Sequence, residues 1–374
     1  MQKNWKILLL LTMISGAASA ESISQKAKEL GVDNLDIDVV SKFAALQGQT
    51  DRANKFAMSV LFDSQLTLTN DFKFISYAGF KYETGTANSG FNERRYAATS
   101  KLVYDYAYIS YKPFNFITLE AGAVDNTSDD SVSPLVNYGV SFLGAREKLK
   151  IASKYMDVTL VATQAMPYND DLSDSIGTVN EGTPKFFSEI VNADIKISDT
   201  LIKLKAGHFA YQDLSNSVAN SDRYFGNTVT GNDESDSEYA YNFKGWLYGA
   251  SAKFKITNYL TVTPAIDTVK NDEAVEGKNK GRTAKLNIDS EIINHKIKAF
   301  FGNFDNESDT APAFYRKSIQ KNSYKGNFVG LTIENPESLK TTIKYVDRTS
   351  KSSSLLIKDE KVYSISLRKS YDIF

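Results

Sequence analysis

Two histidines are the first candidates for chemistry in this chain, because acid-base or nucleophilic catalysis commonly needs a base beside a nucleophile or an acid. His208 precedes the stretch FAYQDLSNS, so Asp213 or Ser215 could approach it. His295 lies in a segment that we expect to form a turn. This spacing matches no hydrolase motif. We therefore favour a protein without enzymatic activity and keep a hydrolase as an alternative.

Metal or cofactor chemistry finds little support in the sequence. The chain has no Cys and only 2 His, so it lacks the usual ligands of a transition metal. The acidic runs DNESD at 305–309 and NDESDSE at 232–238 would hold Ca²⁺ or Mg²⁺ only weakly, and solvated loops explain them more simply. No glycine-rich phosphate loop precedes a predicted helix. We expect no cofactor and no bound metal.

Basic and polar side chains recur at every second position, which indicates the elements that carry them. Successive side chains of a β-strand point to opposite faces. In the segment 282–292 one face is Ala284, Leu286, Ile288, Ser290 and Ile292, and the other is Thr283, Lys285, Asn287, Asp289 and Glu291. The same pattern recurs at 191–197, 202–206 and 363–371. We therefore predict an all-β chain whose strands each have an apolar and a polar face.

Short and long connections alternate along the chain. Short links are expected near 69–71, 112–115, 154–157, 198–200, 257–259, 294–296 and 334–338. Longer polar segments lie between them, at 85–97, 125–138, 167–185, 212–239, 271–281, 306–322 and 350–361. With the first strands at 35–45 and 55–68, this spacing predicts about sixteen antiparallel strands. Short periplasmic turns and long extracellular loops are typical of a transmembrane β-barrel.

The N-terminal segment has the features of a signal peptide. Lys3 and Lys6 precede a short apolar run, and Ala18-Ser19-Ala20 forms an A-x-A cleavage site. The run is shorter than the ~20 apolar residues that a spanning helix needs. We predict a signal peptide at 1–20, a short periplasmic extension at 21–32 and the barrel at 33–374.

The composition of the two faces indicates what each one contacts. A soluble β-sandwich would also alternate, but its apolar faces should carry large aliphatic residues, whereas here Tyr, Phe, Ala and Gly mix with single Leu or Ile. Such faces suit a wall in contact with lipid. Turning Lys285 to hydrocarbon at the midplane would cost roughly 2–4 kcal/mol, so the charged faces should line water. Lys244 and Lys369 fall on apolar faces, where we expect a rim close enough for them to reach water.

The strand that begins at Lys101 carries tyrosines at every second position. We expect Tyr104, Tyr106 and Tyr108 to face lipid. By the same alternation, Lys101 and Asp105 should face an aqueous lumen.

The stretch YAYISYKPFNFITLEAGAV at 106–124, followed by a polar loop, resembles a hairpin of the Gram-negative porins. In that family an aromatic-rich strand, a tight periplasmic turn and a second strand precede the loop that folds into the pore. The terminal Phe374 resembles the C-terminal Phe by which outer-membrane proteins are recognised for assembly. The resemblance covers the mature chain in pattern and these short stretches in residues.

This resemblance implies a pore in which an acidic loop faces a basic wall. The candidate constriction loop is 125–138, with the carboxylates Asp125, Asp129 and Asp130. The candidate wall residues are Lys101, Lys148, Lys150, Lys203, Lys205, Lys285, Lys298, Lys340, Lys344, Arg348 and Arg368. Phe374 would be the assembly signal. The implied partners are outer-membrane lipid and lipopolysaccharide, the barrel assembly machinery and further copies in a homotrimer.

The inward basic positions outnumber the inward acidic ones, and rings of charge set the ion preference of a pore. We expect a bacterial outer-membrane porin, that is, a water-filled channel for passive diffusion of ions and small hydrophilic solutes, weakly selective with modest anion preference. Each wall residue alone could be an ordinary solvated side chain. The alternatives are a non-channel barrel that serves as an adhesin or surface scaffold, and a barrel hydrolase. The formal net charge of -1 gives no reason to expect a nucleic-acid partner.

Overall fold

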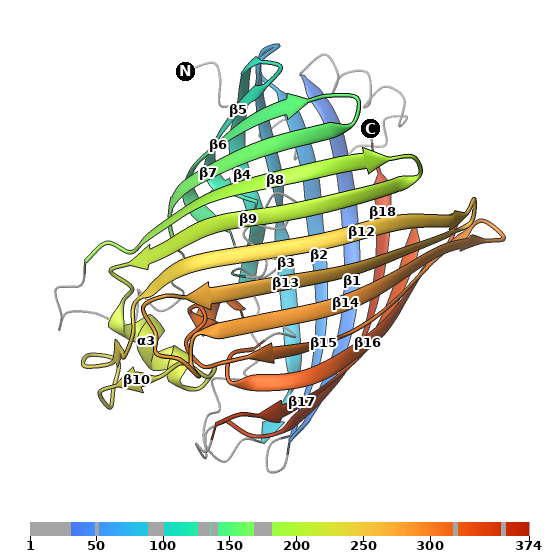
Figure 1. The fold of residues 1–374 in the computed structure, drawn as a ribbon. Coiled ribbons are helices and arrows are strands. Elements are labelled where there is room, and N and C mark those ends of the chain that lie inside the picture. The colour runs from blue at the N-terminus through green and yellow to red at the C-terminus, as the bar shows by residue number, and fades with distance from the viewer. Residues whose placement is uncertain are drawn as a thin grey trace, which may run out of the picture.

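Sixteen antiparallel strands close into a single barrel (Figure 1). The computed structural model describes residues 31–48, 52–88, 101–125, 135, 141–167, 182–316, 321–352 and 357–373. Each strand pairs with its neighbours in sequence, and β18 pairs with β1 to close the ring. The predicted transmembrane β-barrel of about sixteen strands is therefore confirmed. The predicted signal peptide at 1–20 lies outside the described residues.

Most barrel strands are long enough to cross a membrane at a tilt. They are β1 (Val32–Gly48), β2 (Arg52–Thr67), β3 (Phe72–Asn88), β4 (Lys101–Phe114), β5 (Ile117–Val124), β6 (Phe142–Ala152), β7 (Met156–Met166), β8 (Lys185–Ile197), β9 (Thr200–Gln212), β12 (Phe243–Thr257), β13 (Leu260–Asn271), β14 (Lys280–Ile292), β15 (His295–Asn306), β16 (Tyr324–Glu334), β17 (Leu339–Ser350) and β18 (Glu360–Asp372). Outside the barrel wall lie α3 (Asn216–Arg223), the 3₁₀ helix η2 (Ala313–Arg316) and a small hairpin of β10 (Val229–Thr230) and β11 (Glu238–Tyr239). None of the helices in the described part of the chain is long and apolar enough to span a membrane.

Seven short connections lie at one end of the barrel, which we call the turn end. They are 68–71, 115–116, 153–155, 198–199, 258–259, 293–294 and 335–338, and each overlaps a predicted short link. In the two-residue connection 293–294, Ile293 and Asn294 both have positive φ, as a type I′ hairpin requires. The longer connections lie at the opposite loop end, where Figure 1 shows α3 and β10.

The predicted division into two faces is confirmed along most strands. In β18 the side chains of Tyr363, Ile365, Leu367 and Tyr371 are 45–49% exposed on the outer face. On the inner face Arg368 and Ser370 both donate hydrogen bonds to Asp38 of β1. Lys369, on the outer face, donates to the carbonyl of Glu337 in a turn, so it does reach a rim as expected.

A β-bulge reverses the alternation in the middle of β4. The register between β3 and β4 shifts so that Tyr104 pairs with Ala78 and Tyr106 pairs with Tyr77, which leaves Asp105 as an extra residue. One inserted residue exchanges the two faces for the rest of the strand.

The bulge places two of the three tyrosines inside the barrel. The ring of Tyr106 stacks on Tyr77 at 5.8 Å, and the Tyr77 hydroxyl donates to the inner-face Asp38. Tyr108 follows Tyr106 on the same face, with its ring 6.0 Å away. The prediction that Tyr106 and Tyr108 face lipid was wrong, because it assumed strict alternation along the strand and the bulge adds one residue.

Asp105 faces the lumen as expected, since the charges of Lys81 and Arg368 act on its carboxyl group from the inner face. The side chains of Lys101 and Tyr104 lie outside the described residues.

Candidate pore and its inner surface

The predicted basic wall lies on the inner face wherever the structure describes it. The placed residues are Lys148 and Lys150 on β6, Lys203 and Lys205 on β9, Lys285 on β14, Lys298 on β15, Lys340, Lys344 and Arg348 on β17, and Arg368 on β18. Carboxylates neutralise part of this charge. Arg348 Nη2 lies 2.5 Å from the Glu360 carboxylate and Lys148 Nζ lies 2.9 Å from Glu120, whereas Lys203 and Lys298 lie 3.9 and 3.8 Å from their aspartates.

A second group of inner basic residues was missed by the sequence reasoning. Lys55 Nζ and Lys81 Nζ lie 3.3 and 2.5 Å from the Glu83 carboxylate, so one acid serves two cations. Lys42 lies beside them on β1, and its charge acts on Lys344 of β17. We call these three lysines, together with Lys344 of the predicted wall, the basic strip.

The residues next to the three missed lysines in the sequence could have revealed their orientation. Lys42, Lys55 and Lys81 each stand next to a phenylalanine, namely Phe43, Phe56 and Phe80, and these rings are 44, 43 and 66% exposed on the outer face. Because adjacent strand residues point to opposite faces, a lysine beside a lipid-facing ring must point inward.

An ion-pair network closes the seam between the first and last strands. The Asp38 carboxylate is 1% exposed and accepts from Arg368 Nε at 2.9 Å and from the Tyr77 hydroxyl at 2.9 Å. Arg368 Nη2 and the Ser370 hydroxyl also donate to it. Strands β1, β3 and β18 are thus joined by one buried carboxylate, and Arg368 has a structural partner as well as its inner-face position.

The predicted constriction loop begins at a fixed point on the inner wall. Arg146 Nη1 donates to the backbone carbonyl of Asp125 at 2.5 Å and lies 3.4 Å from Glu120. Leu135, further along the loop, is 0% exposed and packs in an apolar cluster inside the barrel. Asp129 and Asp130 lie outside the described residues, as does the assembly signal Phe374.

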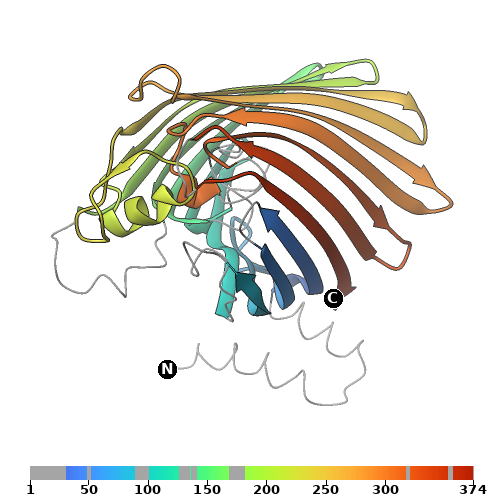
Figure 2. The ribbon, with the colours of Figure 1, turned by 90° about the horizontal axis from the view of Figure 1, so that it is seen from below.

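Apolar side chains line the inner surface of β6 to β13 at the loop end. The wall contributes Phe142, Val161, Ala165, Phe186, Ile190, Phe209, Tyr211, Phe243, Leu247 and Val269, and the loops contribute Leu135, Val218, Ala311, Phe314 and Tyr315. We call this set the loop-end cluster. The ring of Tyr315 in η2 stacks on that of Tyr211 at 5.8 Å and 3°. Figure 2 shows α3 and η2 together at this end of the barrel.

Hydrogen bonds fasten the loop 213–242 to the loop 307–323. The Asn227 amide donates to the carbonyls of Ser308 and Ala311 at 2.8 and 3.1 Å and accepts from the Ala313 N–H at 2.7 Å. Thr228 binds both oxygens of the Asp309 carboxylate through its N–H and hydroxyl, at 2.8 and 2.7 Å. The described parts of both loops are therefore joined at the loop end.

One polar cavity of the lumen lies near the turn end. It has a volume of about 170 Å³ and opens between β4 and β8, and its lining includes Lys148, Lys150, Thr159, Asn192 and Asp194. It offers water-accessible cations, hydroxyls and amides, which suit hydrophilic solutes in transit.

The structure does not assemble a catalytic set around either histidine. The His208 ring packs against Trp246 at 5.3 Å on the outer face of the barrel. Ser215 caps α3 by accepting from the Val218 N–H, and Asp213 lies 3.5 Å from Lys185 at the loop end. His295 Nδ1 contacts the carbonyl of Ile293 in a turn. Over the described ranges, no group of three or more metal-ligating side chains occurs.

The sequence matches no protein-family model and no curated protein. The fold is similar to that of Pseudomonas putida OprB. The high-pH structure of OprB superposes with a TM-score of 0.61 at 12% identity, over 94% of this chain and 97% of that chain. Its low-pH structure gives 0.51 at 10% identity, over 95% and 97%. A loop-deletion mutant of OmpT, an outer membrane protein of Vibrio cholerae, gives 0.50 at 11% identity, over 91% and 99%.

At these identities the likeness shows the fold. The chain has the porin-like fold of a closed sixteen-strand barrel, and its outer wall is apolar, as in barrels that span a lipid bilayer.

Proposed function

We propose that this protein forms a water-filled channel for passive diffusion of ions and small hydrophilic solutes, with a modest preference for anions. The basic strip carries the proposal. Lys42 and Lys344 lie on the inner face, and neither has a carboxylate within ion-pair distance in the described part of the chain. Ser364 and Ser366 of β18 stand between them in the register and add hydroxyl groups. A passing anion would meet two cations whose charge is not already neutralised.

The test is the reversal potential of the purified protein in planar bilayers under a salt gradient. In water a unit charge about 6 Å from an ion contributes about 0.7 kcal/mol, or roughly a threefold change in local anion concentration. Lys42→Gln with Lys344→Gln should therefore lower the anion-to-cation permeability ratio several-fold. Lys369→Gln, on the outer wall, is the matched control and should change nothing. A strong cation preference of the unmodified protein would contradict the proposed selectivity.

The loop-end cluster favours one alternative, a non-channel barrel that displays its loops as an adhesin or surface scaffold. Its apolar side chains occupy inner surface that a wide pore would leave to water. Conductance separates the two functions, since a scaffold would insert into bilayers without current steps. We propose no enzymatic activity, and His208→Ala should leave both conductance and any background lipolysis or proteolysis unchanged.

We also propose that copies of the chain associate in the membrane, as the homotrimer implied by the porin resemblance. The support is on the outer face of β6, where the row is Leu143, Ala145, Glu147, Leu149 and Ile151. Glu147 lies at the centre of that row, and Glu189 of β8 also faces outward. Neither carboxylate has an ion-pair partner among the described residues of its own chain. Contact with another subunit would remove them from hydrocarbon.

Assembly and lipid contacts complete the proposal. Phe374 would be read by the barrel assembly machinery, and truncation of that residue should reduce the amount of folded barrel in the outer membrane without changing synthesis. Lipopolysaccharide would surround the outer wall at the loop end.

A further inference from the structure

The outer wall changes character at the loop end of three neighbouring strands. The outward row of β14 starts at Arg282 and continues as Ala284, Leu286 and Ile288. The row of β13 starts at Lys270 and continues through Thr268 to Ile266. The row of β12 starts at Lys244, which thereby reaches a rim as expected, and continues through Trp246 and Tyr248. Each row runs from a basic residue at the loop end into an apolar or aromatic surface.

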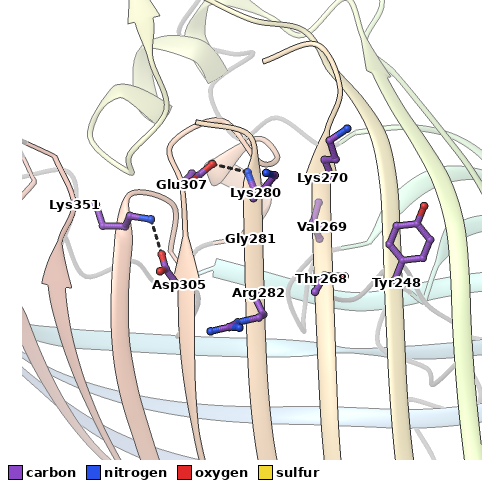
Figure 3. A pocket seen from close by; sticks show the side chains of 10 residues that line it. All are labelled: Tyr248, Thr268, Val269, Lys270, Lys280, Gly281, Arg282, Asp305, Glu307 and Lys351. Carbon is purple, nitrogen blue, oxygen red and sulfur yellow. Dashed lines mark hydrogen bonds and ion pairs between the residues drawn. The ribbon is translucent and has the colours of Figure 1, made fainter. Parts of the chain in front are cut away.

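A cavity of about 400 Å³ lies at this boundary (Figure 3). Its lining includes four cations, Lys270, Lys280, Arg282 and Lys351, and two carboxylates, Asp305 and Glu307, with the ring of Tyr248 on one side. The lining therefore carries more positive than negative charge.

Part of the charge in this cavity is already compensated. Lys351 Nζ lies 2.5 Å from Asp305, and Lys270 Nζ lies 2.6 Å from Asp272. Lys280 lies 3.7 Å from Glu276, which is exposed. Arg282 stands opposite Asp305 in the register but has no ion pair within the described ranges, because Asp305 is engaged by Lys351. In Figure 3 its guanidinium group extends from β14 towards the strand that carries Asp305.

We propose that this cavity binds the phosphate group of an amphipathic glycolipid of the outer leaflet. Arginine presents a planar set of donors that matches phosphate, and basic residues at a membrane surface attract anionic headgroups. The apolar rows directly below the cavity would contact the acyl chains of the same molecule. A soluble anion would satisfy only the cations, whereas a phosphorylated lipid satisfies both surfaces. The site is separate from the lumen, and it depends on membrane insertion rather than on channel activity.

The test uses the whole barrel in detergent and measures binding of bisphosphorylated lipid A by native mass spectrometry and by thermal stabilisation. Each basic residue near an anionic lipid surface contributes about fivefold in affinity, so Lys270→Gln with Arg282→Gln should weaken binding roughly thirtyfold. Lys285→Gln with Lys298→Gln removes the same charge from the inner face of adjacent strands and should leave lipid binding unchanged.

Three further results distinguish the possible ligands. Dephosphorylated lipid A should bind no better to the unmodified protein than to the variant with Lys270→Gln and Arg282→Gln, which we call the outer-wall variant. If it binds as tightly as the phosphorylated form, acyl contact alone explains the binding and the site is refuted. If inorganic phosphate at millimolar concentration stabilises the protein as much as lipid A does, the cavity is a simple anion site and the lipid proposal fails. Conductance is measured in parallel: the outer-wall variant should keep it, so that a failure of the channel proposal is seen independently.

Discussion

At the scale of single residues, the closing seam depends on one buried carboxylate. Asp38 is almost fully buried, so its charge needs Arg368, Tyr77 and Ser370. Arg368→Met would leave that charge without its cation. Breaking a fully buried pair costs about 3–5 kcal/mol, but the Arg368 side chain is 36% exposed and water will replace part of the loss. We expect a decrease of about 2 kcal/mol in the free energy of unfolding, measured by urea titration in lipid vesicles.

Two variants give that measurement its controls. Lys340→Met, on the inner face of the neighbouring strand and without an ion pair in the described residues, should change stability by less than 0.5 kcal/mol, in the range of ordinary surface substitutions. Adding Asp38→Asn to Arg368→Met should cost less than the sum of the two single changes, because both act on the same pair. Full additivity would mean that the pair contributes nothing to the seam.

The bulge at Asp105 makes a second prediction at this scale. Leu102 is 64% exposed on the outer face, whereas Tyr108 lies inside the barrel. With the outward Trp246 first replaced by Phe, a tryptophan introduced at Leu102 should be quenched by brominated lipid, and one introduced at Tyr108 should be quenched by a water-soluble agent such as acrylamide. If brominated lipid quenches both, strict alternation continues through the strand and the bulge is absent.

At the scale of elements, the two loops joined at the loop end should open separately from the barrel. Asn227→Asp preserves shape but removes the donor to the carbonyls of Ser308 and Ala311. A buried group without its partner costs about 1–3 kcal/mol. Hydrogen exchange should therefore speed up in both loops and stay unchanged in the strands. Asn232→Asp, on an exposed turn of the same loop, is the control. Equal acceleration in the strands would show that loops and barrel unfold as one unit.

The sequence predicts those features that neighbouring residues determine, and it does not predict those that depend on contacts between distant segments. Strand faces and turns follow local rules, so the pattern in β14 and β18 and the seven links at the turn end could be predicted. The bulge could not, because Asp105 fits an alternating pattern and only its pairing with β3 shows the inserted residue. The loop-end cluster brings Leu135, Val161 and Phe314 together across long sequence separations, and their contact has no local signal. Inward lysines of β1 to β3 could have been found beside their outward phenylalanines.

At the scale of the whole molecule, the outer wall is not uniform around the barrel. Strands β12 to β14 carry basic residues at the loop end over apolar rows. On β6 to β9 the outer face instead carries alanines, such as Ala145, Ala162 and Ala206, together with the carboxylates Glu147 and Glu189. Small residues allow close approach of another surface, and an outward acid near the midplane is unfavourable in lipid. These two properties favour β6 to β9 as the side on which copies meet.

Because the chain has no Cys, a single introduced cysteine can detect contact between copies without cross-linking through native thiols. Ala162→Cys, between the two outer carboxylates in the register, should give cross-linked oligomers with a short bismaleimide in vesicles, and Ile288→Cys on the outer face of β14 should give almost none. Adding Glu147→Leu removes a penalty of about 1–2 kcal/mol that the separated subunit bears in hydrocarbon. Cross-linking at Ala162→Cys should then fall as subunits separate. Equal yields at both cysteine positions would mean random collision and would remove the support for a defined interface.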